Sequence, residues 1–380
     1  MVKGAGGFLS LFKPSCLAGA LAAGLLAGCA APIISHDFPG IDSLPLQTAT
    51  PNPASDPARL FVIHGMTNHD PNYSDKLVEA LAARLGLVEV EPTNKLIPVP
   101  GAVIVDGKPA AINLRAYALS ANGAERLRVT ALTWSPLTAP LKHKQFSTDD
   151  ELPRVPINGA IKRDVIDDGL CDAVLYVGSY GEVMRRAVKM ALCEFLDGRF
   201  ANDDCAAPAS SRTPVAFIAE SLGSSMLFDG IEALRKTPAR QSMLERTQLL
   251  FMFANQLPLL QLSDVKPTSA TFQAQASLAP VASKLDRFLR SRMAARQAVV
   301  GGAPAAQAPI EVVAFTDPSD LLSYPLEHDN APNDQVINVI YPVATRWLGL
   351  FANPLKAHTG YDSDAKVLSL VVCGSAGCAN

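Results

Sequence analysis

The 380-residue sequence carries little charge: Asp, Glu, Lys and Arg make up 18% of it, and the formal net charge is −3. It has no basic stripe and no internal repeat, so nothing in it favours nucleic acid as a partner. Its seven cysteines lack the paired C-x-x-C spacing of a zinc site, and we assign no metal and no cofactor. After the first 30 residues, no apolar run is long enough to span a membrane. With 48% hydrophobic residues, the chain can bury a full globular core.

The N-terminus has the pattern of an export signal. Lys3 and Lys13 precede an apolar run, residues 17–26, that is too short to cross a bilayer comfortably. The run is followed by Ala-Gly-Cys29, and Leu-Ala-Gly-Cys resembles the bacterial lipobox, in which the cysteine is acylated and becomes the first residue of the mature protein. The resemblance implies a lipoprotein signal peptide at 1–28 and a membrane anchor at Cys29. An ordinary secretory signal with a chance cysteine is the alternative.

The lipobox resemblance also bears on location and domain boundaries. Ala30, where some lipoproteins carry Asp, favours the outer membrane of a bacterial envelope. Residues 29–57 are rich in Pro, Ser, Asp and Thr and are expected to form a tether. Residues 58–380 would then form the folded domain.

Export would permit disulfides among the cysteines that follow the anchor. Cys193 with Cys205, and Cys373 with Cys378, are the locally plausible pairs, which would leave Cys171 unpaired. The spacing by itself does not fix the connectivity.

The body of the chain alternates strand and helix patterns, which predicts an α/β fold with a mainly parallel central sheet flanked by helices. Residues 95–127 look like an inserted hairpin, and residues 265–308 look like a cap-like insert. Helices are expected at 74–85 and around 184–195, and strands at 59–63, 128–134, 215–219, within 249–262, and at 310–315, 336–341 and 367–372.

One strand turns into a helix with a serine at the apex. Ser221 follows the apolar run 215–219 and is flanked, two residues on either side, by Ala219 and Gly223. A nucleophile elbow requires small residues at both positions, because the turn is very tight. The helix that starts after Ser221 would offer free N–H groups to developing negative charge. The alternative is a serine that merely caps a helix.

The segment His64-Gly65-Met66 ends an earlier strand. Gly65 would let the backbone approach a substrate closely, and the N–H groups of Met66 and Leu222 would form an oxyanion hole. Alternatively, His64 only satisfies neighbouring backbone groups. His64 and His69 lack a third ligand signal, so they do not indicate a metal site.

Two later strands are followed by acidic residues and by a histidine. Asp317 and Asp320 lie in a turn after the strand at 310–315, where α/β folds place ligands, although aspartates are common in turns for local reasons. His358 is the one histidine downstream of this turn in a suitable loop.

The order Ser221, Asp320, His358, with His64-Gly65-Met66 upstream, resembles the α/β-hydrolase superfamily, and the upstream segment is similar to the oxyanion stretch of bacterial lipases. The resemblance implies an α/β-hydrolase fold in which Ser221 is the nucleophile, His358 the general base and Asp320 the acid. Asp320 is preferred because Asp-Leu-Leu-Ser matches the family's acid followed by an apolar pair, with Asp317 as the fallback.

The implied activity is hydrolysis of a carboxylic or lipid ester by a membrane-tethered enzyme without a cofactor. Amide or peptide hydrolysis with the same triad, and a non-catalytic envelope lipoprotein that uses the fold for binding, are the alternatives. Glu220 is expected to be a solvated or salt-bridged neighbour of the serine.

The cap-like insert contains an apolar stripe surrounded by basic residues. It is expected to border the substrate pocket. It would be either a lid that touches anionic headgroups or a helix packed on the sheet with a solvated basic face, and we favour the second. The stripe comprises Leu285, Phe288, Leu289 and Met293, and the basic residues are Lys284, Arg287, Arg290, Arg292 and Arg296.

Overall fold

The computed structural model describes residues 31–46, 56–147, 153, 155–208, 213–235, 237–264, 283–299, 310–326, 335–344, 346–347 and 351–378. The signal-peptide prediction at 1–28 and the anchor Cys29 lie outside these residues. No helix in the described ranges is long and apolar enough to cross a membrane.

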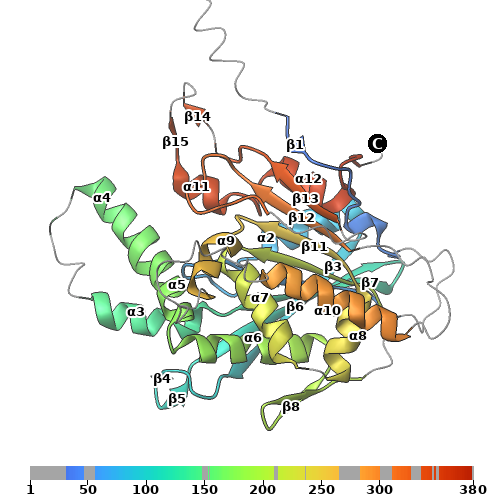
Figure 1. Ribbon diagram of the computed structural model, residues 1–380, viewed down its shortest axis with the longest axis horizontal. Helices are drawn as coiled ribbons and strands as arrows, with labels where there is room; N and C mark the ends of the chain where they lie inside the picture. The colour runs from blue at the N-terminus through green and yellow to red at the C-terminus, as the bar shows by residue number, and fades with distance from the viewer. Residues whose placement is uncertain are drawn as a thin grey trace, which may run out of the picture.

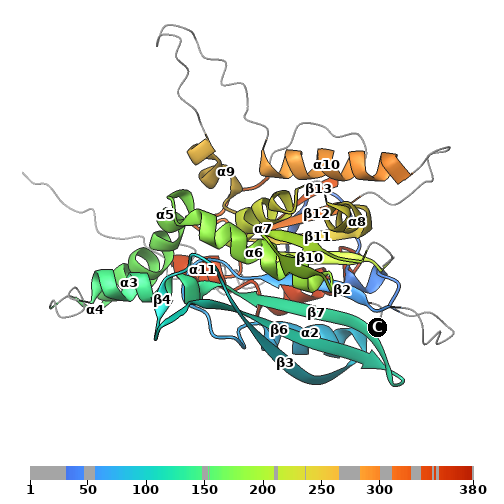
Figure 2. The ribbon, with the colours of Figure 1, turned by 90° about the horizontal axis from the view of Figure 1, so that it is seen from below.

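A nine-stranded sheet forms the centre of the described chain, and helices cover both of its faces (Figure 1 and Figure 2). The strand order is β1-β13-β12-β11-β10-β2-β7-β6-β3, and the six strands from β13 to β7 are parallel. The predicted mainly parallel α/β architecture is confirmed. The strands of this sheet are β1 Ile33–Ile34, β2 Ala58–Ile63, β3 Val88–Pro98, β6 Ala111–Ala121, β7 Ala124–Thr133, β10 Val215–Glu220, β11 Thr247–Phe253, β12 Glu311–Thr316 and β13 Gln335–Ile340.

Among the described residues, three two-stranded antiparallel sheets accompany the central sheet. They are formed by β4 Ile104–Val105 with β5 Lys108–Pro109, β8 Arg199–Ala201 with β9 Asp204–Ala206, and β14 Arg346–Trp347 with β15 Phe351–Ala352.

The central strands are buried on both faces, which is why they read as continuous apolar runs. In β10, Phe217 belongs to the hydrophobic cluster on one face of the sheet, whereas Ile218 belongs to the cluster on the other. The first cluster packs under α6, α7, α8 and α10, and the second under α2 and α12.

The helices are α2 Asp75–Leu85, α3 Ala139–Phe146, α4 Pro156–Ile161, α5 Cys171–Val177, α6 Gly181–Phe195, α7 Leu222–Ala233, α8 Pro238–Arg246, α9 Leu257–Leu260, α10 Lys284–Val299, α11 Pro354–Thr359 and α12 Ala365–Cys373, with 3-10 turns η1 Ile41–Ser43, η2 Ser135–Leu137 and η4 Gln261–Asp264 and a π-helix η3 Lys162–Leu170.

The strand predicted at 367–372 is wrong, because this segment lies in helix α12. The carboxylate of Asp364 accepts hydrogen bonds from the N–H groups of Lys366 and Val367, at 2.8 and 3.0 Å, and so caps the helix N-terminus. Gly374, with φ of 66°, ends it. A short apolar run is compatible with either a buried strand or a buried helix, and here the caps decide.

The hairpin predicted at 95–127 is not a separate insert. Its strands belong to β3, β6 and β7, which pair antiparallel and extend the central sheet at one side. The small hairpin β4–β5 is the part of this range that stands apart from the sheet.

Residues 31–46, expected to lie in the tether, are part of the folded domain. Strand β1 pairs with β13, and Ile41 is fully buried. The N–H of Phe38 donates to the hydroxyl of Ser375, and the N–H of Ser375 donates to the carbonyl of Phe38, each at 3.0 Å. Although the range is rich in polar residues, its apolar side chains belong to the hydrophobic core.

The two locally plausible cysteine pairs are both disulfides. Cys193–Cys205 joins the end of α6 to the β8–β9 hairpin, and Cys373–Cys378 closes a short C-terminal loop. Cys171 is free.

Candidate active site

Ser221 occupies a strained turn between β10 and α7. Its backbone has φ of 51° and ψ of −123°, in the region that side chains other than glycine rarely adopt. The N–H of Ser221 donates to the carbonyl of Phe253 at 2.8 Å, which ties the turn to the end of β11. Such strain persists where the surrounding structure holds it, and it is common at functional sites.

The turn has no room for larger residues on the side that faces β2. A Cβ on Gly223 would lie 2.4 Å from the carbonyl oxygen of His64, and a Cβ on Gly65 would lie 2.8 Å from that of Ser221. Gly223 is therefore required by the close approach of the loop after β2, in addition to the tightness of the turn itself. Ala219 is fully buried in β10.

The structure brings Ser221, His358 and Asp320 together in one hydrogen-bonded chain. Ser221 Oγ lies 2.9 Å from His358 Nε2, and His358 Nδ1 lies 2.9 and 2.8 Å from the two carboxylate oxygens of Asp320. Ser221 follows β10, Asp320 follows β12, and His358 lies in α11. All three side chains are buried. With the Nδ1 proton directed at Asp320, Nε2 is free to accept the proton of the serine hydroxyl.

Asp317 lies in the same turn as Asp320 but does not contact His358. Its buried carboxylate accepts hydrogen bonds from three backbone N–H groups, those of Ser319 at 2.7 Å, Val343 at 2.8 Å and Ala344 at 2.9 Å. These contacts join the turn after β12 to the loop after β13, so Asp317 has a structural role.

The two expected oxyanion donors are the backbone N–H groups of Leu222, directly after Ser221, and of Met66, in the loop after β2. Leu222 is the first residue of α7, so its N–H has no acceptor within the helix. No described residue accepts the N–H of Met66. The carbonyl of Gly65 accepts a hydrogen bond from His64 Nδ1 at 2.8 Å, and a trans peptide unit directs the Met66 N–H to the opposite side.

His64 holds this loop as a neutral side chain. Its Nε2 accepts from the N–H of Trp134 at 3.1 Å, which leaves Nδ1 as the protonated nitrogen, and its ring stacks on the indole. Burial, followed by the neighbouring His69 and Lys142, lowers the pKa of His64 well below its ordinary value. In the described part of the chain, no three His, Cys, Asp or Glu side chains gather as a metal site would require.

Glu220 differs from expectation, since it is neither well solvated nor salt-bridged to any described residue. Burial raises its pKa to about 8, and the nearby carboxylates of Asp362 and Asp320 also raise it, whereas a hydrogen bond from the Gly65 N–H lowers it. At neutral pH the side chain next to Ser221 is therefore mostly uncharged.

A helical arm made of α4, η3 and α5 rests on the loop that carries Met66. The N–H of Thr67 donates to Asp172 in the arm at 2.9 Å, and the amide of Asn68 donates to Asp168 at 3.0 Å. Asp172 is fully buried and pairs with Lys142 of α3 at 3.0 Å. This arm was not predicted, because part of it is a π-helix that breaks the 3.6-residue period.

The described part of the cap-like insert is α10, which packs on α7 and α8, with Leu285, Phe288 and Leu289 buried. That the insert borders the substrate pocket stays a prediction. Arg292, expected on the solvated face, is buried and donates to the carbonyl of Thr247 at 3.0 Å. The rest of the predicted insert, 265–282 and 300–308, lies outside the described residues.

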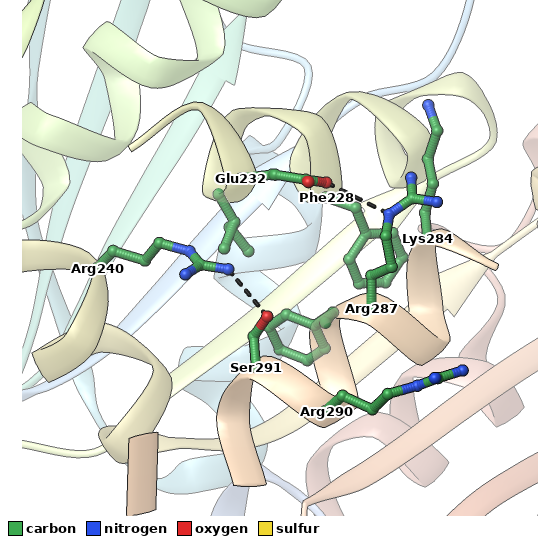
Figure 3. A pocket seen from close by; sticks show the side chains of 9 residues that line it. Phe228, Glu232, Arg240, Lys284, Arg287, Arg290 and Ser291 are labelled. Carbon is green, nitrogen blue, oxygen red and sulfur yellow. Dashed lines mark hydrogen bonds and ion pairs between the residues drawn. The ribbon is translucent and has the colours of Figure 1, made fainter. Parts of the chain in front are cut away.

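A pocket of about 220 Å³ lies between α7, α8 and α10 (Figure 3). Most of its cations already have partners: Arg240 donates to Ser291 at 3.0 Å, and Arg287 lies 3.4 Å from Glu232. We assign no substrate to this pocket.

No protein-family model matches the chain, and no curated protein matches its sequence.

Proposed function

We propose that this protein is a serine hydrolase with an α/β-hydrolase fold that cleaves carboxylic esters, including lipid esters. The observation that carries the proposal is the hydrogen-bonded chain from Asp320 through His358 to Ser221, whose serine stands at the apex of a strained strand-to-helix turn. A serine that only capped α7 would need neither the positive φ nor a histidine on its hydroxyl.

In the first half of the reaction, Ser221 Oγ attacks the ester carbonyl carbon while its proton passes to His358 Nε2. Asp320 stabilises the imidazolium that forms, and the N–H groups of Met66 and Leu222 bind the tetrahedral oxyanion. His358 then gives the proton to the leaving oxygen, an alcohol departs, and the acyl group remains on Ser221.

In the second half, His358 removes a proton from water, and the resulting hydroxide attacks the acyl-enzyme carbonyl. When this second tetrahedral intermediate collapses, the proton returns to Ser221 and the carboxylic acid leaves. No cofactor enters either half.

We further propose that acylated Cys29 anchors the enzyme in a bacterial envelope membrane, with the outer membrane favoured by Ala30. The support is the Leu-Ala-Gly-Cys29 pattern at the end of an apolar run. Replacing Cys29 with Ser and fractionating cells tests this: fatty-acid labelling and membrane association should both disappear.

The hydrolase proposal is tested with a fluorophosphonate probe and a panel of p-nitrophenyl esters of increasing acyl length. Wild-type protein should be labelled and active, whereas Ser221→Ala and His358→Ala should lose turnover while retaining the wild-type thermal melt. The matched control is Ser224→Ala, one turn along α7, whose buried hydroxyl donates to the carbonyl of Ala219 at 3.3 Å. It should remain labelled and active. An unlabelled, inactive wild type would favour a binding module instead.

A further inference from the structure

The outward side of the arm α4–η3–α5 carries a row of apolar side chains. Their exposed fractions range from 41% to 61%, which is unusual for five branched aliphatic residues on one element. The row is Ile161, Ile166, Leu170, Val174 and Val177, and we call it the apolar row.

The spacing of the apolar row follows the geometry of the arm. The first step is five residues, from Ile161 to Ile166, and it enters the π-helix η3, whose hydrogen bonds run from i to i+5 and which ends at Leu170. The next steps are four, four and three residues, as one face of a helix requires. The five side chains therefore lie along a common side of the arm.

The inward side of the arm is rich in polar groups. Asp167 and Asp172 are buried, and Asp172 accepts from Lys142 and from the Thr67 backbone. A surface helix of a water-soluble protein ordinarily turns its apolar stripe inward and its charges outward. This arm does so only in part, and its outer apolar row fits an apolar surrounding better than water.

Strand β1 indicates on which side of the domain an apolar surrounding would lie. Strand β1 runs antiparallel to β13, with Ile33 opposite Ile340, the last residue of β13. The described residues that precede Ile33 therefore lie beyond the carboxyl end of β13, at the edge of the parallel strands at which Ser221 lies. Cys29 is four residues upstream, so it can lie at most about 14 Å away, at roughly 3.3–3.6 Å per residue.

The anchor and the arm flank the active site on this edge. The arm follows β7 and contacts the loop after β2, while β1 lies six strand positions from β7, or about 29 Å at roughly 4.8 Å per spacing. Ser221 follows β10, which lies between them. Leu321, which directly follows Asp320 and is 76% exposed, adds an apolar side chain between the two flanks.

We propose that the carboxyl edge of the sheet lies against the bilayer that holds acylated Cys29, with the apolar row inserted among the lipid headgroups and acyl chains. The active site then opens toward the membrane, and the ester substrate is a lipid of that membrane. This inference rests on the proposed function and on the acylation of Cys29. The occupant of the apolar row is the lipid surface, because a chain anchored within about 14 Å of the same edge holds that edge beside the bilayer.

The first test is independent of catalysis. Full-length acylated protein carrying Val174→Cys in a Cys171→Ser background is labelled with a polarity-sensitive fluorophore and reconstituted in phospholipid vesicles. The matched control carries Val88→Cys, since Val88 is 70% exposed and lies at the start of β3, on the opposite edge of the sheet. The fluorophore at position 174 should shift to the blue and become accessible to lipid-borne quenchers, while the one at position 88 should not.

A probe at position 174 that stays as water-exposed as the control would overturn the inference. So would a blue shift in detergent-free solution accompanied by a doubled mass in sedimentation, because a second copy of the chain would then cover the apolar row.

The second test concerns the substrate. The double variant Leu170→Ser/Val174→Ser should lower, about tenfold, the ratio of turnover on a lipid ester in vesicles to turnover on a soluble short-chain ester. The exposed pair Val88→Ser/Val90→Ser should leave this ratio at the wild-type value. If all proteins hydrolyse the soluble ester and the ratio is the same in all, the membrane orientation is wrong and the hydrolase proposal stands. If wild type hydrolyses neither ester, the proposed function itself fails, and the fluorophore test still decides the orientation.

Discussion

The two edges of the parallel sheet differ in the polar side chains that they bury. The carboxyl edge buries Ser221, His358 and Asp320 around a backbone turn with positive φ. The amino edge buries Arg59, but its guanidinium donates to the carbonyl of Phe195 at 2.6 Å and pairs with Asp197. The strained turn and the buried Ser221–His358–Asp320 chain lie at the carboxyl edge, whereas the charge buried on Arg59 at the amino edge is paired with Asp197.

The comparison indicates how a site of this kind is kept in place. Strained turns and buried polar side chains cost stability, so they persist only on a framework that over-determines them. At the amino edge the disulfide Cys193–Cys205 and ion pairs supply part of that framework. Substitutions in the triad at the carboxyl edge should therefore change activity more than stability, and those at the amino edge the reverse.

The largest contrast should come from the two aspartates of one turn. Asp320→Asn should lower kcat on a short-chain ester by about 10³–10⁴, because His358 loses its orienting partner and the stabilisation of its protonated form. Asp317→Asn places an amide group opposite the N–H donors of Val343 and Ala344, so it should lower the free energy of unfolding by about 2–3 kcal/mol. Its kcat should change little at a temperature where it is folded.

Steady-state kinetics and thermal melts on both variants check this pair. A dead Asp317→Asn beside an active Asp320→Asn would transfer the acid role to Asp317.

The next contrast concerns the turn itself. Gly223→Ala adds a Cβ at 2.4 Å from the His64 carbonyl oxygen, which must displace the loop that carries Met66. A displacement near 1 Å can cost about 10² in rate, and we expect a loss of that size in kcat/KM. Ala219→Gly is the control on the other side of Ser221, and it should keep kcat/KM within a few-fold of wild type. Equal activity of both variants and wild type would show that the loop position is not critical.

A smaller effect should follow from Glu220. Because its folded pKa is raised to about 8 from 4.5, the native state binds a proton that the unfolded state releases between those values. The free energy of unfolding should therefore fall as pH rises from about 4.5 to 8 on account of this group. Glu220→Gln should remove this component of the fall, and it should be more stable than wild type at pH 9.

Denaturant unfolding of both proteins at pH 5, 7 and 9 measures the difference. Parallel pH profiles for the two proteins would contradict the assignment of this carboxyl group.

The smallest effect on activity is expected at the amino edge. The double variant Cys193→Ala/Cys205→Ala lacks the disulfide that joins residues 12 positions apart. Its free energy of unfolding should be lower by about 3 kcal/mol, since the unfolded chain is no longer cross-linked and gains conformational entropy. The kcat on a short-chain ester should remain at the wild-type value. A variant with reduced kcat and an unchanged melt would break the division between the two edges.

Much of the sheet could be predicted from sequence, because strands buried on both faces read as apolar runs. The segments 59–63 and 215–219 lie within β2 and β10, and the segment 310–315 overlaps β12 in all but its first residue. The run 367–372 was misread because apolar periodicity could not separate strand from helix, although Asp364 and Gly374 carried the capping signals.

Residues of the candidate site could be predicted from the sequence where a single local pattern pointed to a single residue. The small residues around Ser221 and the order of acid and base led to three side chains that the fold places within hydrogen-bonding distance. The raised pKa of Glu220 and the arm on the Met66 loop were not accessible. Both depend on which distant segments pack against them, and the π-helix η3 has no simple sequence period.

The pairing of the two chain ends has a consequence for how the molecule assembles. Phe38 and Ser375, which exchange hydrogen bonds, are 337 positions apart in the chain. At about 5–20 residues per second, synthesis separates their appearance by roughly 17–67 s. Strand β1 cannot join β13 until most of the chain has been made, so this edge of the sheet closes late. The residues of strand β1 are thus among the last of the sheet to reach their final positions.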